Sequence, residues 1–399
     1  MKKSILFAIH YLELGGAERS LIGLLRVLDY SKVQVDLFVY SHRGELMKEI
    51  PQEVNLLPEI PEYAQIERPL KDVLKDGYLR LFLARIKAKW QFAKYKKQNH
   101  PKDGNAIFSY VAKNVTPLLP PINPDKEYDL AVSFLAPHDI VLNKVNARKK
   151  ACWVHTDYTK VNVNADMELP VWSQFDHIAA ISEGVAEAFI SRFPSLCEKV
   201  EVVPNIIDAQ GVLEQSRAYD VTKEMPQEDG VTQLLSVGRF TEAKNFDNVP
   251  DICRRILNAG VPVRWYLIGY GGDESLIRRR IAEAGMEKNV IILGKKDNPY
   301  PYMHACDVYV QPSRYEGCPV TIQEAQVLGK PVIATAFPTV KSAIQDGVNG
   351  VIVPLDNEGC AQGLVRILQD SVFQNRFSGI HHEDLTENQS LTTIYEWTK

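Results

Sequence analysis

Short apolar runs alternate with longer segments of helical periodicity along most of the chain. Many of the runs are continuous rather than alternating, as at 232–237 (TQLLSV), which is typical of parallel strands buried on both faces. The pattern predicts two doubly wound α/β domains. Strands are expected at 4–9, 33–40, 128–134, 151–155, 177–181, 200–203, 232–237, 263–268, 290–293, 307–311, 331–335 and 350–353, and helices at segments such as 245–259, 273–284 and 319–329.

The boundary between the domains is expected in the segment 208–230, which is polar, contains Pro226 and Gly230, and lacks a core-like run. The length of 399 residues suits two domains of roughly 150–200 residues each. We predict a Rossmann-like domain over 1–207, a second one over 208–390, and a C-terminal helix over 391–399 that packs back on the first domain.

The composition narrows the class of protein. A net charge of −4 argues against a nucleic-acid binder, which needs a strongly basic face. No apolar run approaches the roughly 18–20 residues of a membrane span. The basic and then apolar start at 1–10 is interpreted as a buried strand, because it is short for a signal peptide and lacks a small-residue cleavage site. The six scattered cysteines indicate reduced thiols and a cytoplasmic location.

The segment 77–102 departs from the alternation, because it contains no acidic residue and many basic ones. A basic amphipathic helix of this kind is typical of a protein that lies on an anionic membrane. The other interpretation is a surface helix whose apolar stripe packs on the first domain. Six apolar residues fall on one face at helical spacing: Leu79, Phe82, Leu83, Ile86, Trp90 and Ala93.

Two glutamates lie near the end of a predicted strand in the segment 314–325 (RYEGCPVTIQEA). Ligands bind beyond the carboxyl ends of parallel strands. Glu316 and Glu324 are therefore candidates to accept hydrogen bonds from sugar hydroxyls. The predicted helix starts near Pro319, so its first amides, those of Val320 and Thr321, are candidates to face an anion. The alternative is that two glutamates eight residues apart occur by chance.

Two cations follow the predicted strand 232–237. Arg239 and Lys244 lie where a guanidinium and an ammonium would stabilise the negative charge that develops on a diphosphate leaving group. Their alternative is a pair of solvated surface cations.

The paired glycines Gly15 and Gly16 follow the first strand and are either a phosphate or sugar cradle or a tight turn. His155 ends another strand and either contacts substrate or is a satisfied interior histidine. No cluster has metal-ligand spacing, so we predict that no metal is required.

These pieces, in this order, resemble the family 4 retaining glycosyltransferases, which have the GT-B fold of two Rossmann-like domains that face each other across a cleft. The resemblance spans nearly the whole chain and is densest in the second domain. The matching stretches are GGAER at 15–19, ISEG at 181–184, VPNIID at 203–208, SVGRFTEAKN at 236–245, NPYPYMHACDVYVQPSRYEGCPVTIQEAQVLGKPVIAT at 298–335 and DGVNGVIVP at 346–354.

The resemblance implies a role for each candidate residue. Arg239 and Lys244 are assigned to the diphosphate of a nucleotide-sugar donor, Glu324 to its ribose and Glu316 to the hydroxyls of its sugar. His155 is expected to approach the transferred sugar. The other donor-binding positions that it implies are Gly15, Gly16, Gly238, Cys318, Pro319, Val320 and Thr321.

The implied activity is transfer, with retention of configuration, from a nucleotide-diphosphate sugar to a polysaccharide or lipid-linked acceptor in cell-surface glycan synthesis. UDP-sugars are favoured, no further cofactor is required, and the expected location is cytoplasmic and peripheral at the inner face of the membrane. Cys318 stands where a bulkier Phe, Leu or Met is usual in the family, and Pro319 where Gly is common, which leaves the preferred sugar open. The alternatives are a GT-B nucleotide-sugar epimerase and a non-catalytic sugar-nucleotide-binding protein.

Overall fold

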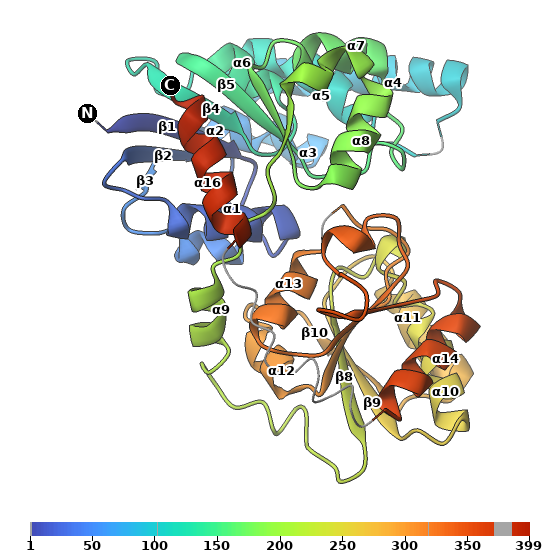
Figure 1. The fold of residues 1–399 in the computed structure, drawn as a ribbon. Coiled ribbons are helices and arrows are strands. Elements are labelled where there is room, and N and C mark those ends of the chain that lie inside the picture. The colour runs from blue at the N-terminus through green and yellow to red at the C-terminus, as the bar shows by residue number, and fades with distance from the viewer. Residues whose placement is uncertain (1, 102, 318, 371–384) are drawn as a thin grey trace. The chain divides into compact units, whose positions relative to one another are not determined.

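The computed structural model describes residues 2–101, 103–317, 319–370 and 385–399. The chain divides into two compact units. Unit 1 comprises residues 1–206 and 385–399, and unit 2 comprises 207–384. Each unit contains one parallel sheet with helices packed against it (Figure 1).

The sheet of unit 1 has the order β3-β2-β1-β4-β5-β6-β7, and every pair of neighbours is parallel. Its strands are β1 (Lys3–Ile9), β2 (Val33–Val39), β3 (Asn55–Leu56), β4 (Tyr128–Ser133), β5 (Ala147–Val154), β6 (His177–Ala180) and β7 (Val200–Val202). The helices of this unit are α1 (Gly16–Val27), α2 (Pro61–Ala64), α3 (Leu70–Lys75), α4 (Leu79–Asn99), α5 (Ile107–Val115), α6 (Asp139–Lys144), α7 (Ala165–Trp172), α8 (Glu183–Arg192) and α16 (Leu385–Trp397), with 3₁₀ turns at Glu45–Glu49, Thr116–Leu118 and Pro194–Lys199.

The sheet of unit 2 has the order β10-β9-β8-β11-β12-β13 and is also parallel. Its strands are β8 (Thr232–Val237), β9 (Val263–Ile268), β10 (Val290–Gly294), β11 (Val308–Gln311), β12 (Val332–Thr335) and β13 (Val351–Val353). The helices are α9 (Ala209–Gln215), α10 (Val249–Asn258), α11 (Glu274–Ala284), α12 (Tyr300–Ala305), α13 (Val320–Val327) and α14 (Asn357–Leu368), with 3₁₀ turns at Glu242–Lys244 and Val340–Ser342.

The continuous apolar runs are explained by the two faces of these sheets. Leu234 belongs to one buried cluster of unit 2 and its neighbour Leu235 to another. On β9, Trp265 and Tyr266 divide in the same way. Because successive side chains of a strand point to opposite faces, a strand covered on both sides is apolar at most of its positions. The predicted α/β fold is confirmed.

Several elements differ from their expected bounds; β5, for example, begins at Ala147 and not at 151. The strand β3 was not expected, because its two residues are too short to form a recognisable apolar run. The helix expected at 245–259 begins only at Val249. Asn245 adopts a left-handed backbone (φ 61°) at the end of the 3₁₀ turn, which separates that turn from α10.

Each sheet has one topological switch point. The chain runs outward from β1 to β3 and then returns to place β4 on the other side of β1. In unit 2 it runs from β8 to β10 and returns to place β11 beside β8. In open α/β sheets, ligands bind outside the carboxyl ends of the strands at such points. The β1/β4 and β8/β11 edges are therefore the first places to look for a site.

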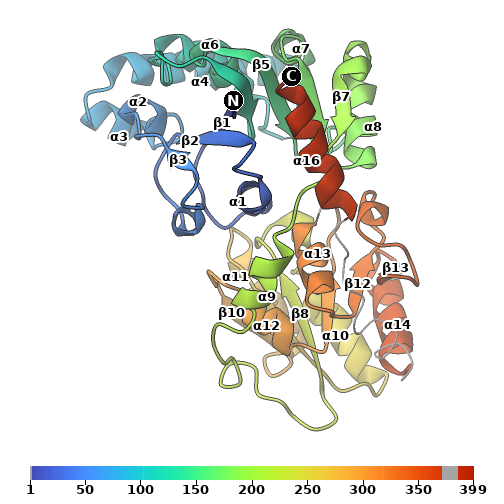
Figure 2. The same ribbon diagram turned by 60° about the vertical axis from the view of Figure 1, so that its left-hand side comes forward.

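The helix α16 belongs to unit 1, although it follows unit 2 in the sequence (Figure 2). The Trp397 ring stacks on His177, with the ring centroids 4.9 Å apart, and its Nε1 donates to Glu201 Oε1 at 2.9 Å. The hydroxyl of Tyr395 accepts from the backbone N–H of Asp29 at 2.8 Å. The helix is longer than the expected 391–399, since it begins at Leu385.

The helix α4 leaves four large apolar residues exposed to solvent. Leu81, Ala84 and Ala88 are buried, whereas Leu79, Leu83, Ile86 and Trp90 are exposed by 54%, 55%, 42% and 67%. Of the expected stripe, only Phe82 packs against the core of unit 1. The interpretation in which the stripe packs on its own domain is therefore wrong for those four residues. Among the described residues, no helix is long and apolar enough to cross a membrane.

Candidate functional site

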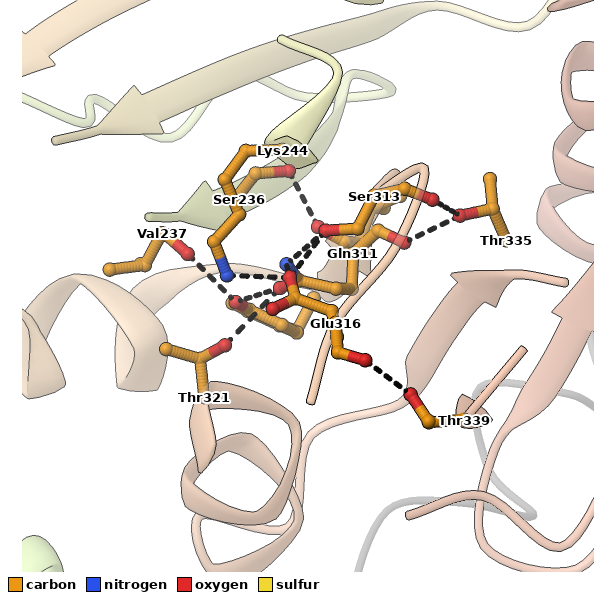
Figure 3. A network of polar contacts seen from close by, with 11 residues as sticks. Ser236, Val237, Lys244, Gln311, Ser313, Glu316, Thr321, Thr335 and Thr339 are labelled. Carbon is orange, nitrogen blue, oxygen red and sulfur yellow. Dashed lines mark hydrogen bonds and ion pairs between the residues drawn. The ribbon is translucent and has the colours of Figure 1, made fainter. Parts of the chain in front are cut away.

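Several of the residues expected to bind a donor gather at the β8/β11 edge of unit 2. Lys244 lies in the 3₁₀ turn that follows β8, and Glu316 lies in the loop that follows β11 (Figure 3). Lys244 Nζ donates to Glu316 Oε1 at 2.5 Å, and the two side chains are only 18% and 11% exposed. An ammonium and a carboxylate in contact, away from bulk solvent, form a strong charge-assisted hydrogen bond.

Gly238 makes room for the lysine. A Cβ atom at this position would lie 3.0 Å from Lys244 Cε and 3.1 Å from its Cδ. The loop after β9 packs on the same backbone, because a Cβ at Gly269 would lie 1.9 Å from the carbonyl oxygen of Gly238. The amide of Phe240 donates to the carbonyl of Tyr270 at 2.8 Å. The two loops therefore form one closely packed wall, and the glycines are needed for this approach.

Gln311 connects several residues of the site through hydrogen bonds, and the sequence did not predict this role. Its side chain is fully buried at the end of β11. Its Nε2 donates to Glu316 Oε1 at 2.9 Å and to Ser313 Oγ at 2.8 Å, and its Oε1 accepts from Tyr309 and Thr321 (Figure 3). Gln311 thus connects the Glu316 carboxylate to the first turn of α13.

The loop that carries Glu316 is held at both ends. Thr335 Oγ1 donates to the backbone carbonyl of Ser313 at 2.6 Å, and Thr339 Oγ1 donates to that of Glu316 at 2.7 Å (Figure 3). Ser313 Oγ in turn donates to Glu316 Oε1 at 2.6 Å. Three donors therefore converge on one carboxylate oxygen, which fixes the rotamer of Glu316.

The helix α13 begins at Val320, directly after Pro319. The first four amides of a helix have no intrahelical acceptor, so those of Val320 and Thr321 are placed to receive an anion. Cys318, the remaining residue of this turn that was expected to bind donor, lies outside the described residues. Arg239 follows β8 and its side chain is exposed.

Glu324 lies further along α13 and is 2% exposed. Its Oε1 accepts from the hydroxyl of Tyr300 at 2.8 Å. Its Oε2 is buried without a hydrogen-bond partner. A buried carboxylate oxygen without a donor costs free energy, which makes it a candidate to receive a hydrogen bond from a ligand.

In unit 1, the paired glycines start α1, with Gly15 as its N-cap and Gly16 as its first residue. A Cβ at Gly15 would lie 2.0 Å from Glu18 Oε2, so this position is closely packed. His155 follows β5, and its Nε2 is buried without a hydrogen-bond partner. Burial lowers the pKa of His155 to about 4, so the ring is neutral at pH 7.

Two more histidines lie at the switch point of unit 1 and were missed. His10 follows β1, and burial together with Arg43 lowers its pKa to about 4. His138 follows β4, its Nδ1 lies 2.8 Å from Ser133 Oγ, and burial and the neighbouring histidines lower its pKa to about 3. The signal that could have found them is their position just after the two strands that flank the switch point. The carboxyl edge of this sheet therefore presents neutral imidazoles at pH 7.

No three His, Cys, Asp or Glu side chains gather as metal ligands within the part of the chain that the structure describes. That no metal is required stays a prediction. The described cysteines are all free thiols, and only Cys197 among them is exposed.

Residues 221–384 match the family model described as Glycosyl transferases group 1. This part of the chain is therefore similar to the glycosyltransferase domains of that group, and it lies within unit 2. It contains β8, β11 and α13, and thus the whole cluster around Glu316.

Individual proteins give the same picture. The chain is 28% identical over 166 residues to the lipopolysaccharide core biosynthesis glycosyltransferase LpsE of Rhizobium meliloti, covering 41% of this chain and 48% of LpsE. It is 24% identical over 209 residues to the N-acetylgalactosamine-N,N'-diacetylbacillosaminyl-diphospho-undecaprenol 4-alpha-N-acetylgalactosaminyltransferase of Campylobacter jejuni, covering 52% and 54% of the two chains. The chain thus spans about half the length of these curated relatives.

The structure of Anabaena Alr3699/HepE in complex with UDP and glucose is similar over 98% of each chain, with a TM-score of 0.66 and 16% sequence identity. This likeness extends over both units and assigns the fold to the GT-B class, as the resemblance in the sequence implies.

Proposed function

We propose that this protein is a retaining glycosyltransferase that moves a sugar from a nucleotide-diphosphate sugar, with UDP as the favoured nucleotide, to a glycan or lipid-linked acceptor. The observation that carries the proposal is the contact of Lys244 with Glu316, in a nearly buried network at the β8/β11 edge beside the start of α13. The relatives support the choice of substrates. HepE was crystallised with UDP and glucose, and the Campylobacter enzyme is named for a diphospho-undecaprenol-linked acceptor.

The chemistry needs a place for leaving-group charge. The bond between the sugar C1 and the β-phosphate oxygen breaks, and its electron pair stays on that oxygen. The acceptor hydroxyl oxygen forms the new bond to C1 on the same face, and its proton passes to the departing phosphate. Lys244, Arg239 and the first amides of α13 stabilise the diphosphate. No enzymic nucleophile is required.

The ion pair gives Lys244 and Glu316 a second role before the donor binds. Each charge is neutralised by the other, so the empty site does not hold an isolated buried charge. A diphosphate draws Lys244 away from Glu316, because it carries more negative charge than one carboxylate. Gln311 and Ser313 keep Glu316 in place, and its oxygen becomes available to a sugar hydroxyl.

The nucleotide is tested by thermal unfolding of the full chain with a panel of UDP-, GDP- and ADP-sugars. We expect UDP-sugars to raise the melting temperature, since a ligand at 100 times its Kd adds about 2.7 kcal/mol. The free sugars serve as controls. Analysis of the UDP-sugar after incubation without acceptor identifies an epimerase, because an epimerase changes the sugar, whereas a transferase or a binding protein leaves it intact. Release of UDP only when acceptor is added separates a transferase from a binding protein. If no nucleotide sugar shifts the transition, the proposal fails.

The exposed face of α4 supports a peripheral location. Leu83, Ile86 and Trp90 lie outside together with basic side chains, and an anionic bilayer offers both an apolar phase and negative charge. We infer that this face, defined by Leu79, Leu83, Ile86 and Trp90 with the exposed cations Arg80, Lys87, Lys89, Lys94, Lys96 and Lys97, rests on the membrane that carries the acceptor.

Substitution of this face will weaken binding to anionic vesicles. Each lysine near such a surface contributes about 1 kcal/mol, so Lys87→Gln with Lys94→Gln will reduce partitioning by roughly 10- to 30-fold. Cosedimentation with vesicles of phosphatidylglycerol and phosphatidylcholine measures the effect, and added salt should mimic it. Leu118→Ser, an exposed apolar residue of the same unit outside this face, is the control. Equal binding to vesicles of phosphatidylcholine alone would contradict the inference.

A further inference from the structure

Unit 1 contains a cavity of about 310 Å³ between α5, α7 and the start of α6. Its volume lies at the lower end of the range of small-molecule sites, roughly 300–1,000 Å³. The walls include Tyr158, which follows β5, and the loop from Ala136 to Asp139, which follows β4. The cavity therefore opens at the carboxyl edge of the sheet, beside the switch point, where ligands of open α/β sheets bind.

The two helices that form the walls are joined by a carboxylate. Glu168 on α7 accepts from Ser109 Oγ on α5 at 2.8 Å. It also accepts from the Tyr158 hydroxyl at 3.2 Å and from Trp172 Nε1 at 3.5 Å. These contacts hold Tyr158 and Trp172 in fixed positions against the cavity. The wall of the cavity is thus preorganised, which reduces the conformational entropy that is lost when a ligand binds.

Asp139 is a second acidic residue of the lining. It is partly buried, and its carboxyl accepts a hydrogen bond from its own backbone amide. Burial raises the pKa of Asp139 above its usual value. A carboxylate can accept several hydrogen bonds, so this one has free positions for donors that enter the cavity.

The charges of the lining select the ligand. Among the described residues that line the cavity, Asp139, Asp166 and Glu168 are acidic and Lys113 is the one lysine or arginine. His138 adds no positive charge at pH 7, because its pKa is lowered to about 3. Phosphate and carboxylate groups would be repelled here. Hydroxyl groups, in contrast, donate to carboxylates, and the aromatic rings provide apolar surface for the C–H face of a sugar.

Phe108 also lines the cavity. It lies on α5 and is 55% exposed, so it does not belong to the apolar core. An exposed aromatic ring and carboxylates in one lining suit a sugar ring, because one face of the sugar ring is apolar and its rim carries hydroxyls.

We propose that this cavity binds an uncharged sugar ring of the acceptor, through carboxylate acceptors at Asp139 and Glu168 and an aromatic contact at Phe108. This proposal rests on the proposed function and specifies its acceptor. The acceptor sugar that occupies the cavity of unit 1 is a neutral hexose unit and not a uronic acid or a sugar phosphate.

The test uses ligand-observed saturation-transfer NMR on the full chain. The probes are methyl α-glucoside, methyl α-galactoside and the methyl glycoside of N-acetylglucosamine, with methyl glucuronide and glucose 6-phosphate as charged counterparts. We expect at least one neutral probe to bind 10-fold or more tightly than both charged ones. Phe108→Ala and Asp139→Asn should each weaken that binding at least 10-fold. Tyr219→Ala and Asp125→Asn are matched controls, because both residues are exposed and lie outside the cavity.

The same samples separate this proposal from the proposed function. UDP-sugar binding, measured by thermal unfolding, should be unchanged in the Phe108 and Asp139 variants. If UDP-sugars bind but no neutral probe does, or if both variants bind the probe as the unmodified chain does, the cavity is not a sugar site. Equal binding of the charged probes also overturns the proposal. If UDP-sugars themselves do not bind, the proposed function fails instead.

Discussion

Combining Lys244→Met with Glu316→Gln in one chain should restore stability but not sugar transfer. Each single change leaves the other charge nearly buried without its partner, which costs about 1–3 kcal/mol of unfolding free energy. The double variant removes both charges, so most of that loss returns. Turnover stays lower by about 100- to 1,000-fold in all three variants, since charge stabilisation at the leaving group is missing.

Two measurements check this result: urea unfolding for stability, and release of UDP coupled to transfer for turnover. Glu242→Gln is the control, because its side chain is exposed and lies in the same turn as Lys244. If the ion pair had a structural role alone, the double variant would regain activity together with stability. In that case the assignment of Lys244 and Glu316 to the donor would be wrong.

Glu324→Gln should separate nucleotide binding from stability. The change keeps the shape of the side chain and the contact with the Tyr300 hydroxyl, and it removes a buried carboxylate oxygen that has no partner. We expect the unfolding free energy to be unchanged or raised. Affinity for UDP should fall by about 10- to 100-fold, because a hydrogen bond from a ribose hydroxyl to a carboxylate is worth about 1.5–3 kcal/mol.

Calorimetric titration with UDP measures this loss, and Glu287→Gln on the exposed surface is the control. Tyr300→Phe adds a second comparison, since it removes the hydrogen bond that Glu324 Oε1 receives from the Tyr300 hydroxyl. If Glu324→Gln binds UDP as tightly as the unmodified chain, Glu324 does not contact the nucleotide and its burial is structural.

The sequence predicts the fold well because its signal is repeated. The predicted strand segments match every described strand longer than two residues, and for the central strands, such as β8 and β9, the cause of the apolar run is burial on both faces of a parallel sheet. The two-residue strand β3 carries no such run. The exposed stripe of α4 shows the limit of periodicity, because Leu83 and Leu81 are equally apolar and only the structure determines which one faces the core.

The site is predicted less completely, for a different reason. Charged residues such as Glu316 and Lys244 stand out in a chain, and their positions after β11 and β8 point to a ligand. Their direct contact does not follow from the sequence, since they are 72 positions apart. Gln311 gives no signal at all, because a single glutamine inside an apolar strand could equally be an edge residue. Its role comes from four side-chain partners that only tertiary packing brings together.

The origin of α16 has a consequence for how the chain folds during synthesis. Unit 1 starts first on the ribosome but needs residues 385–399 to be whole. Until unit 2 has been made, Trp153 and His177 lack the Trp397 ring that packs against them. Unit 1 therefore stays incomplete while unit 2 is translated. During that interval the uncovered apolar surface of unit 1 is available to a chaperone. Unit 1 is therefore completed after unit 2, although its synthesis begins before that of unit 2.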